Sequence, residues 1–176
     1  MSFDIIVALD EKGGFGKGGM LPWFFPKELA HFSRITRQSF YDNDEENTLI
    51  MGRKTWESIP EKKRPLVGRQ SIVVSSTMTE DTYGCKIARS LQHALDKRCL
   101  KSKCFVIGGY GLIKEAMSHP SFDTLWLSRI EGTFDCDLYI KEWVNIEEGN
   151  VPFKTIEDTN QCDKNVYTIH CFQLNL

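Results

Sequence analysis

The stretch TLIMGRKTWESIP, residues 48–60, carries the pattern from which the fold is predicted. Its first part, residues 48–51, is a short apolar run typical of a buried strand. Residues 55–59 have the composition of a helical turn, which Pro60 stops because proline cannot continue a helix. A buried strand that passes through Gly52 into a helix is expected where strands and helices alternate, as in an α/β fold.

The same alternation continues along the chain. We predict further strands at residues 3–9, 71–75, 104–107 and 125–130, helices at 26–36, 90–100 (with Ser90 as N-cap) and 112–118, and loops at 10–19 and 37–47. The last apolar runs, 153–157 and 166–174, flank the polar turn 158–165 and predict a closing antiparallel pair. Residues 1–176 should therefore form one α/β domain with a largely parallel sheet.

Composition excludes several classes of protein. The chain has 176 residues, 41% of them hydrophobic, and a net charge of −2, which argues against a nucleic-acid or anionic-membrane surface. No apolar run approaches a membrane span, and the first residues lack the basic start of a secretory signal. The six cysteines form no C-x-x-C pair, so we expect reduced thiols in a cytoplasmic protein, with no metal site.

Residues 14–19, GFGKGG, match the dinucleotide pattern G-x-G-x-x-G after a predicted strand. That fingerprint requires a helix to open within the glycines, and Pro22 makes a helix at this point unfavourable. We therefore reject a Rossmann interpretation and predict a flexible loop. A mobile loop of this kind can still act as a lid over a neighbouring site.

Three strand ends suggest a nucleotide site. IGGYG (107–111) lies between a strand and a helix, GRKT (52–55) places two cations and a hydroxyl after another strand, and SST (75–77) adds hydroxyls after a third. Each has a simpler interpretation, as a tight turn or a solvated basic turn. Because the carboxyl ends of parallel strands lie at one edge of a sheet, their convergence favours a dinucleotide.

Glu28 is the carboxylate that we single out. It lies with Phe32 and Ile35 at i, i+4 and i+7, beside the apolar face of the predicted helix. Partial desolvation there would raise its pKa and suit it to an amidine-like group. An exposed glutamate stabilised by the helix dipole is the alternative, and the residue pattern alone favours that alternative. The four histidines show no metal spacing.

Several motifs together resemble the dihydrofolate reductase family. They are IVA (6–8), GKGGMLPW (16–23), PKELAHF (26–32), MGRKTWESIP (51–60), RPL (64–66), GR (68–69), VVSS (73–76), IGG (107–109), SRI (128–130) and CD (136–137), in the family's order over nearly the whole chain. The resemblance implies a three-layer fold, with a central, mostly parallel eight-stranded sheet, an antiparallel C-terminal strand and helices on both faces. It implies reduction of dihydrofolate to tetrahydrofolate, by hydride transfer from nicotinamide C4 of NADPH to pterin C6 with protonation at N5.

The resemblance also implies a substrate site. Glu28 would bind the pterin 2-amino group and N3, Trp23 would hold a water, and Ser128 would bond the carboxylate in place of the family's usual threonine. Arg69 would pair with the glutamate-tail carboxylate, a charge-assisted contact of roughly 1.5–3 kcal/mol. The remaining residues expected along the folate are Ile6, Phe32, Ile59, Leu66 and Ile107. Antifolate inhibitors would bind the same site.

For NADPH, the resemblance implies nicotinamide contacts from the first strand and the glycine loop, and phosphate and adenosine contacts from the three strand ends. The residues concerned are Ala8, Phe15, Gly16, Leu21, Gly52, Arg53, Lys54, Thr55, Ser75, Ser76, Thr77, Ile107, Gly108, Gly109, Tyr110, Gly111 and Leu112. Arg53 or Lys54, with Ser76, would bind the 2′-phosphate, which is the reason to expect NADPH rather than NADH. A monomer is expected.

Three departures from the family pattern are Ile113 for an aromatic residue, Leu138 for threonine and Lys141 for proline. Two other functions stay open. One is a relative on the same fold that reduces a ribosylamino-pyrimidine in flavin synthesis, for which Arg69 would have no clear use. The other is an inactive folate- or nucleotide-binding protein, to which Ile113 gives slight support.

Overall fold

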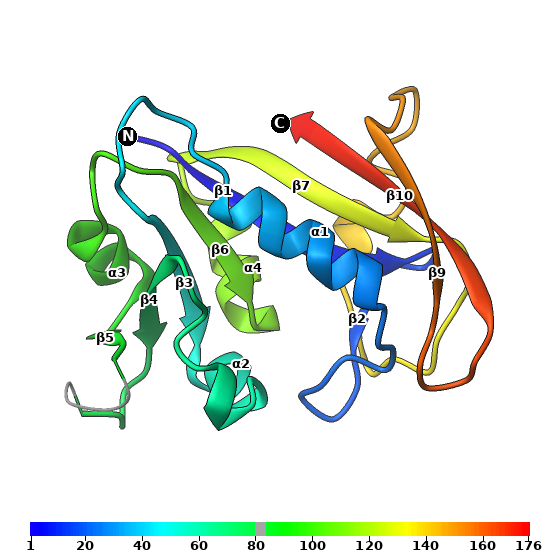
Figure 1. Cartoon of the computed structure of the whole chain (residues 1–176), viewed down its shortest axis with the longest axis horizontal. Coiled ribbons are helices and arrows are strands. Elements are labelled where there is room, and N and C mark those ends of the chain that lie inside the picture. The colour runs from blue at the N-terminus through cyan, green and yellow to red at the C-terminus, as the bar shows by residue number, and fades with distance from the viewer. Residues whose placement is uncertain (80–83) are drawn as a thin grey trace. The chain divides into compact units, whose positions relative to one another are not determined.

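The computed structural model describes residues 1–79 and 84–176 (Figure 1). These fall into two compact units, residues 1–5 with 34–123 and residues 6–33 with 124–176. Our expectation of one domain stays a prediction.

The strands form an eight-stranded sheet in the order β5-β4-β3-β6-β1-β7-β10-β9. The pairs β1–β6, β6–β3, β3–β4 and β4–β5 are parallel. The C-terminal strand β10 is antiparallel to both β7 and β9. This is the predicted fold class, a mostly parallel sheet with an antiparallel C-terminal strand.

The first unit holds the predicted strand-to-helix turns. Its strands are β3 (Asn47–Gly52), β4 (Arg69–Val74), β5 (Lys86–Ala88) and β6 (Cys104–Gly108), and its helices are α2 (Arg53–Ser58), α3 (Leu91–Lys97), α4 (Tyr110–Met117) and the short 3₁₀ helix η1 (Glu61–Lys63). In Figure 1, α2 continues directly from β3. Ser90 caps α3 as predicted, because its Oγ accepts a hydrogen bond from the His93 N–H at 3.1 Å. The helix ends at Lys97, three residues earlier than expected.

The second unit is built from strands and one long helix. They are β1 (Phe3–Asp10, whose first three residues belong to the first unit), β2 (Gly14–Gly16), α1 (Pro26–Arg37, up to Ser33), β7 (Phe122–Ile130, from Thr124), β8 (Leu138–Tyr139), η2 (Lys141–Trp143), β9 (Lys154–Thr159) and β10 (Val166–Asn175). The long antiparallel pair β9–β10 is visible in Figure 1 and confirms the closing pair. Buried aromatic and aliphatic side chains, among them Trp23, Phe25 and Ile169, form a core cluster here.

The prediction of a flexible loop over residues 10–19 was wrong in part. Gly14–Gly16 forms the short strand β2, which pairs antiparallel with β8 in a separate two-stranded sheet. A Cβ at Gly14 would lie 2.5 Å from Asp10 Oδ2, so this glycine allows a close approach rather than free motion. The rejection of a Rossmann motif is confirmed, since the first helix after these glycines begins only at Pro26.

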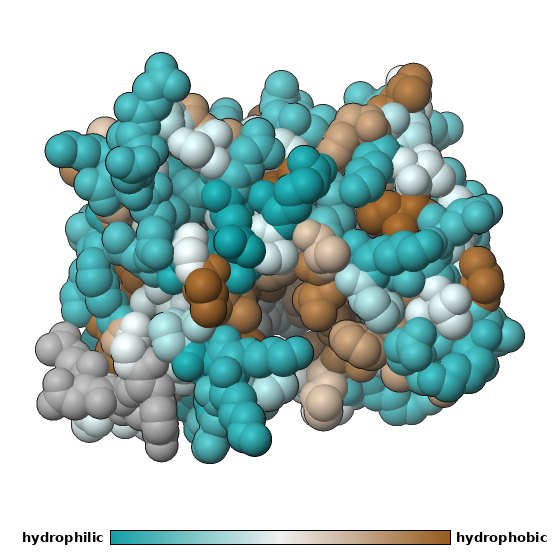
Figure 2. Space-filling view, viewed as in Figure 1, coloured by the Kyte–Doolittle hydropathy of each residue, from teal (hydrophilic) through white to brown (hydrophobic). Residues whose placement is uncertain are grey.

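The cysteines and the surface are the remaining features of the fold. All six cysteines are free, with Cys85, Cys104 and Cys171 buried and Cys162 exposed. No helix within residues 1–79 and 84–176 has the length and apolar character to cross a membrane. Hydrophilic side chains cover most of the face in Figure 2, with smaller hydrophobic areas among them.

Candidate functional site

Glu28 lies in the first turn of α1, half-buried, with its carboxyl desolvated. Burial raises the pKa of this carboxyl from its ordinary value to about 7, and the negative charge of Asp158 adds to the rise. A hydrogen bond with the Ser128 side chain opposes it. The residue pattern alone had favoured an exposed glutamate, and the structure overturns that preference, because Ser128 and Asp158, both distant in sequence, interact with this carboxyl.

Two further predicted residues lie in the same unit. Ser128 is 5% exposed on β7, and its Oγ lies 3.9 Å from Sγ of Cys171, its partner across the β7–β10 pair. Trp23 is 4% exposed and belongs to the core cluster that includes Cys171. Its Nε1 is buried without a hydrogen-bond partner among the described residues. A buried N–H of this kind is normally satisfied by a water or a ligand.

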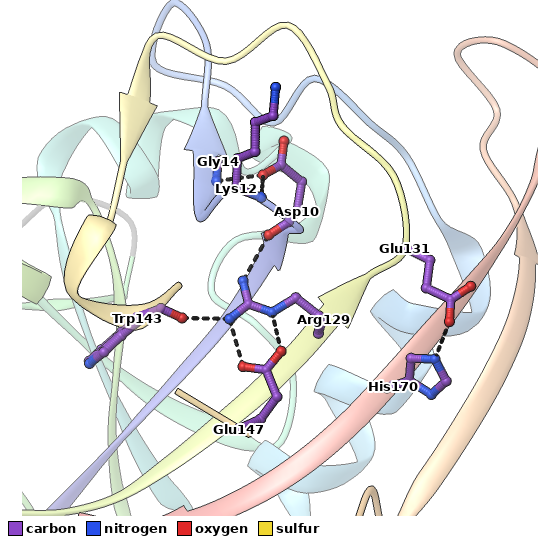
Figure 3. Close-up of polar contacts among 8 residues, drawn as sticks. All are labelled: Asp10, Lys12, Gly14, Arg129, Glu131, Trp143, Glu147 and His170. Atoms are coloured by element: carbon purple, nitrogen blue, oxygen red, sulfur yellow. Dashed lines mark hydrogen bonds and ion pairs between the residues drawn. The ribbon is translucent and has the colours of Figure 1, made fainter. Parts of the chain in front are cut away.

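A polar network fixes the chain on both sides of β2 (Figure 3). The Asp10 carboxylate is fully buried and accepts hydrogen bonds from the backbone N–H groups of Lys12, Gly14 and Phe134 at 2.7–3.0 Å. Arg129 donates to the Asp10 carbonyl at 2.8 Å, which ties β7 to the end of β1. Beyond β2, the Gly18 N–H donates to Asp137. Phe15 and Gly16 therefore lie on backbone held at both ends, Ala8 lies within β1, and Leu21 is exposed.

The first unit brings the three predicted strand ends together. Met51 of β3 pairs with Gly108 of β6, and Gly52 pairs with Val74 of β4. A Cβ at Gly52 would lie 3.5 Å from the Gly109 backbone nitrogen, and one at Gly109 would lie 3.5 Å from Thr55 Oγ1. The turns that precede α2 and α4 are thus in contact, as expected from the parallel sheet.

The cations and hydroxyls at these ends differ in how they are engaged. Arg53 pairs with Glu57 at 3.2 Å, whereas Lys54 is exposed and makes no ion pair with a described residue. Ser75 is buried, and its Oγ accepts from the backbone of Thr77 and Met78, so it organises the turn. Ser76 and Thr77 are exposed and available to a ligand.

Sequence reasoning missed Arg89. Its Nη1 donates to the carbonyls of Ser75 at 2.7 Å and of Met78 at 2.8 Å, which places a cation beside the turn at residues 75–78. The signal was present in the sequence, since Arg89 directly follows an apolar run at 87–88 and precedes the Ser90 cap. That run was too short to be recognised as the strand β5.

Arg69 begins β4 and is 8% exposed. Its Nε donates to the Val67 carbonyl and its Nη1 to Thr36 Oγ1, while Nη2 makes no hydrogen bond with a described residue. Burial and the neighbouring Arg37 lower the pKa of this guanidinium, opposed by Glu46. The guanidinium is therefore oriented by two contacts and retains donor capacity for an anion.

The other expected residues divide between the units. Ile59, Leu66, Ile107, Tyr110 and Leu112 are half-buried in the first unit, where Gly111 is exposed. Ile6 is buried and Phe32 half-buried in the second. Ile113, one of the departures from the family pattern, is fully buried in α4. Within residues 1–79 and 84–176, no cluster of three His, Cys, Asp or Glu residues could hold a metal ion.

Comparisons with known proteins agree with this arrangement. A family model described as dihydrofolate reductase matches residues 2–175. The chain is 36% identical over 163 residues to the dihydrofolate reductase of Pneumocystis carinii, covering 82% of this chain and 79% of that protein. It is 38% identical over 151 residues to bifunctional dihydrofolate reductase-thymidylate synthase 1 of Arabidopsis thaliana, covering 79% of this chain but only 28% of that relative's length.

A solved structure extends the similarity to the fold. The Schistosoma mansoni dihydrofolate reductase matches with a TM-score of 0.78 at 31% identity, covering 99% of this chain and 98% of the other. The family match over residues 2–175, the relatives and this structure together show that the chain belongs to the dihydrofolate reductase family.

Proposed function

We propose that this protein reduces 7,8-dihydrofolate to 5,6,7,8-tetrahydrofolate with NADPH, and that antifolates bind the same site. The observation that carries the proposal is Glu28, a desolvated carboxyl with a pKa of about 7, hydrogen-bonded to Ser128. A glutamate with a purely structural role in a first helical turn stabilises the helix best when it is exposed and ionised. A desolvated glutamate at this position therefore indicates a functional role.

Glu28 would orient the pterin. When ionised, its two oxygens accept hydrogen bonds from the 2-amino group and N3 of the ring, a charge-assisted pair that fixes the ring plane. The reaction consumes one proton at N5. With a pKa near 7, Glu28 keeps a proton available at neutral pH, and a water held at the free Nε1 of Trp23 would be the immediate donor.

The chain's residues fit NADPH in two ways. The adjoining turns at Gly52 and Gly109 carry no side chain that would block the phosphates, Arg53 and Lys54 would supply positive charge after β3, and Arg89 would supply it beside Ser76 and Thr77. NADPH, when bound, would supply the hydride delivered to pterin C6. Ala8 and Phe15 would hold the nicotinamide amide through backbone groups, and the residues around β2 would exclude water from the reacting rings.

Arg69 would select folates over other pterins. Two of its nitrogens are already held by Val67 and Thr36, so binding the α-carboxylate of the glutamate tail costs little side-chain entropy. The half-buried Phe32, Ile59 and Leu66 would supply the apolar surface for the benzoyl part of the substrate.

The test is a direct absorbance assay with protein, NADPH and dihydrofolate, with and without a tight antifolate. Loss of NADPH absorbance that requires dihydrofolate and stops with the antifolate would support the proposal. Tight binding of both ligands without turnover would instead favour an inactive binding protein.

Arg69→Leu separates folate reduction from reduction of a phosphorylated pyrimidine. The KM for dihydrofolate should rise at least tenfold, as expected for loss of a charge-assisted contact, with little change in kcat. A pterin substrate without a glutamate tail should be insensitive to the change. An unaltered KM for dihydrofolate in Arg69→Leu would remove the folate assignment.

A further inference from the structure

The helix that carries Glu28 lacks a cap of its own. The residue before the helix is Phe25, whose side chain has no acceptor, and the first helical residue is Pro26, which has no N–H. The Leu29 N–H donates to the Phe25 carbonyl at 3.0 Å. The two remaining free donors of the first turn are therefore the N–H groups of Lys27 and Glu28.

One carboxylate oxygen satisfies both donors. Oδ2 of Asp158, on β9, accepts from the Lys27 N–H at 2.6 Å and from the Glu28 N–H at 3.1 Å. Asp158 is 5% exposed, and its Oδ1 accepts from the Thr159 N–H at 2.9 Å, which fixes the carboxylate on its own strand. This is the contact that an N-cap residue normally makes, provided here from another strand.

We propose that Asp158 is a positioning residue for Glu28: its carboxylate caps the helix, fixes the Glu28 backbone against β9 and holds a negative charge beside the Glu28 carboxyl. The proposal rests on the proposed function only for its effect on turnover. The capping contact and the charge are properties of the protein alone.

The placement has two opposed electrostatic effects. A carboxylate at a helix N-terminus is favourable, because it interacts with the positive end of the helix dipole. That same positive end would draw Glu28 towards its ionised form. Burial is the main cause of the raised pKa of Glu28, and the charge of Asp158 adds to the rise. Asp158 thus stabilises the helix and helps the carboxyl in its first turn to retain a proton.

The other titratable groups around this turn are oriented differently. Lys27 donates its Nζ to the Glu157 carbonyl, the Glu157 side chain is exposed on β9, and His31 lies one turn further along α1 with its ring 5.7 Å from Phe153. Cys171 on β10 is buried, and Asp163, in the turn between β9 and β10, accepts a hydrogen bond from the Tyr167 hydroxyl of β10. Among these groups, Asp158 is the one that bonds the Glu28 backbone.

Asp158→Asn and Asp158→Ala separate the two effects. Asparagine keeps one acceptor oxygen for the two helix N–H groups but turns its NH2 towards the Thr159 N–H, so Asp158→Asn should lose the charge and less thermal stability than Asp158→Ala. Asp158→Ala should lose the charge and the cap, with Tm lower by roughly 2–4 °C. Glu157→Gln is the matched control, because it removes an exposed carboxylate from the adjacent position of the same strand.

The direct measurement is the titration of Glu28 in the ligand-free protein, followed by carboxyl ¹³C NMR with Glu28→Gln to assign the signal. Both Asp158 variants should lower the Glu28 midpoint by at least roughly half a pH unit, and Glu157→Gln should leave it in place. If the protein reduces dihydrofolate, the alkaline limb of kcat should shift by the same amount.

An unchanged Glu28 midpoint in Asp158→Asn would overturn the proposal, whether or not Asp158→Ala folds. A shifted midpoint in a protein that does not reduce dihydrofolate would support the role of Asp158 and overturn the proposed function instead.

Discussion

Arg129 and Glu147 form a two-point ion pair, with Nε–Oε1 at 2.7 Å and Nη2–Oε2 at 2.8 Å (Figure 3). The Arg129 side chain is 7% exposed, and the same guanidinium donates to the carbonyls of Asp10 and Trp143. Removing one partner leaves a buried charge. We therefore expect Arg129→Met to lower the free energy of unfolding by about 3–5 kcal/mol, measured by urea denaturation.

The matched control is the exposed pair of Arg53 and Glu57, whose side chains are 45% and 51% exposed. Glu57→Gln should change the free energy of unfolding by less than about 0.5 kcal/mol. Equal effects of Arg129→Met and Glu57→Gln would show that the Arg129 network contributes nothing beyond a surface contact.

Glu28 makes stability depend on pH in a defined direction. Its pKa is about 7 in the folded protein against an ordinary value of 4.5, so the folded state holds the proton more tightly than the unfolded state. This group's contribution is fully present below pH 4.5 and is lost as pH rises through 7. The wild-type free energy of unfolding should therefore lose up to about 3 kcal/mol relative to Glu28→Gln between pH 4.5 and pH 8.

Urea denaturation of both proteins at several pH values measures this difference. Glu157→Gln should follow the wild-type curve, because that carboxylate is exposed. At neutral pH, the kcat of Glu28→Gln should be far below that of the wild type. The wild-type kcat should decline as pH rises above about 7. Parallel stability curves for wild type and Glu28→Gln would show that Glu28 titrates normally.

Lys54 should set the preference for NADPH over NADH. It has no ion pair with a described residue, whereas Arg53 is partly engaged by Glu57. Loss of one charge-assisted phosphate contact should reduce the ratio of kcat/KM for NADPH to that for NADH by at least tenfold in Lys54→Gln. Lys62→Gln, which removes another exposed lysine of the same unit, should leave the ratio unaltered.

Gly14 should tolerate no side chain. A Cβ there would meet Asp10 Oδ2 at 2.5 Å and Cys136 Sγ at 2.7 Å, both parts of the network around β2. Gly14→Ala should lower the free energy of unfolding by about 1–3 kcal/mol, measured by thermal or urea denaturation. Gly111→Ala, where the new methyl meets no atom within 4 Å, should be neutral or stabilising by up to about 1 kcal/mol.

The parallel part of the fold follows from local patterns. The apolar run at 48–51 and the glycine after it predicted β3 and the turn into α2, and register then brought Gly52 beside Gly109. The strands β2, β5 and β8 were missed because each has only two or three residues. Such segments become strands only through the partner they meet, which a local pattern does not contain.

Less of the candidate site than of the fold could be predicted from the sequence. The residue pattern singled out Glu28 but favoured an exposed residue of a first helical turn, and only the family resemblance assigned it to substrate binding. Its environment depends on Ser128 and Asp158, which are remote in the chain. Long-range desolvation of this kind leaves no trace in the spacing of neighbouring residues, and neither does a helix cap contributed by another strand.

The contact between Glu28 and Asp158 spans 130 positions of the chain. During synthesis, α1 is made long before β9. Until β9 is made, the N–H groups of Lys27 and Glu28 lack their capping carboxylate, and the Glu28 carboxyl lacks its neighbour Asp158. Fragments that end before β9 would carry every residue proposed for the cofactor and yet lack the carboxylate that caps the helix of Glu28. Under the proposed function, affinity for dihydrofolate should therefore appear only at the last stage of folding, when β9 pairs with β10.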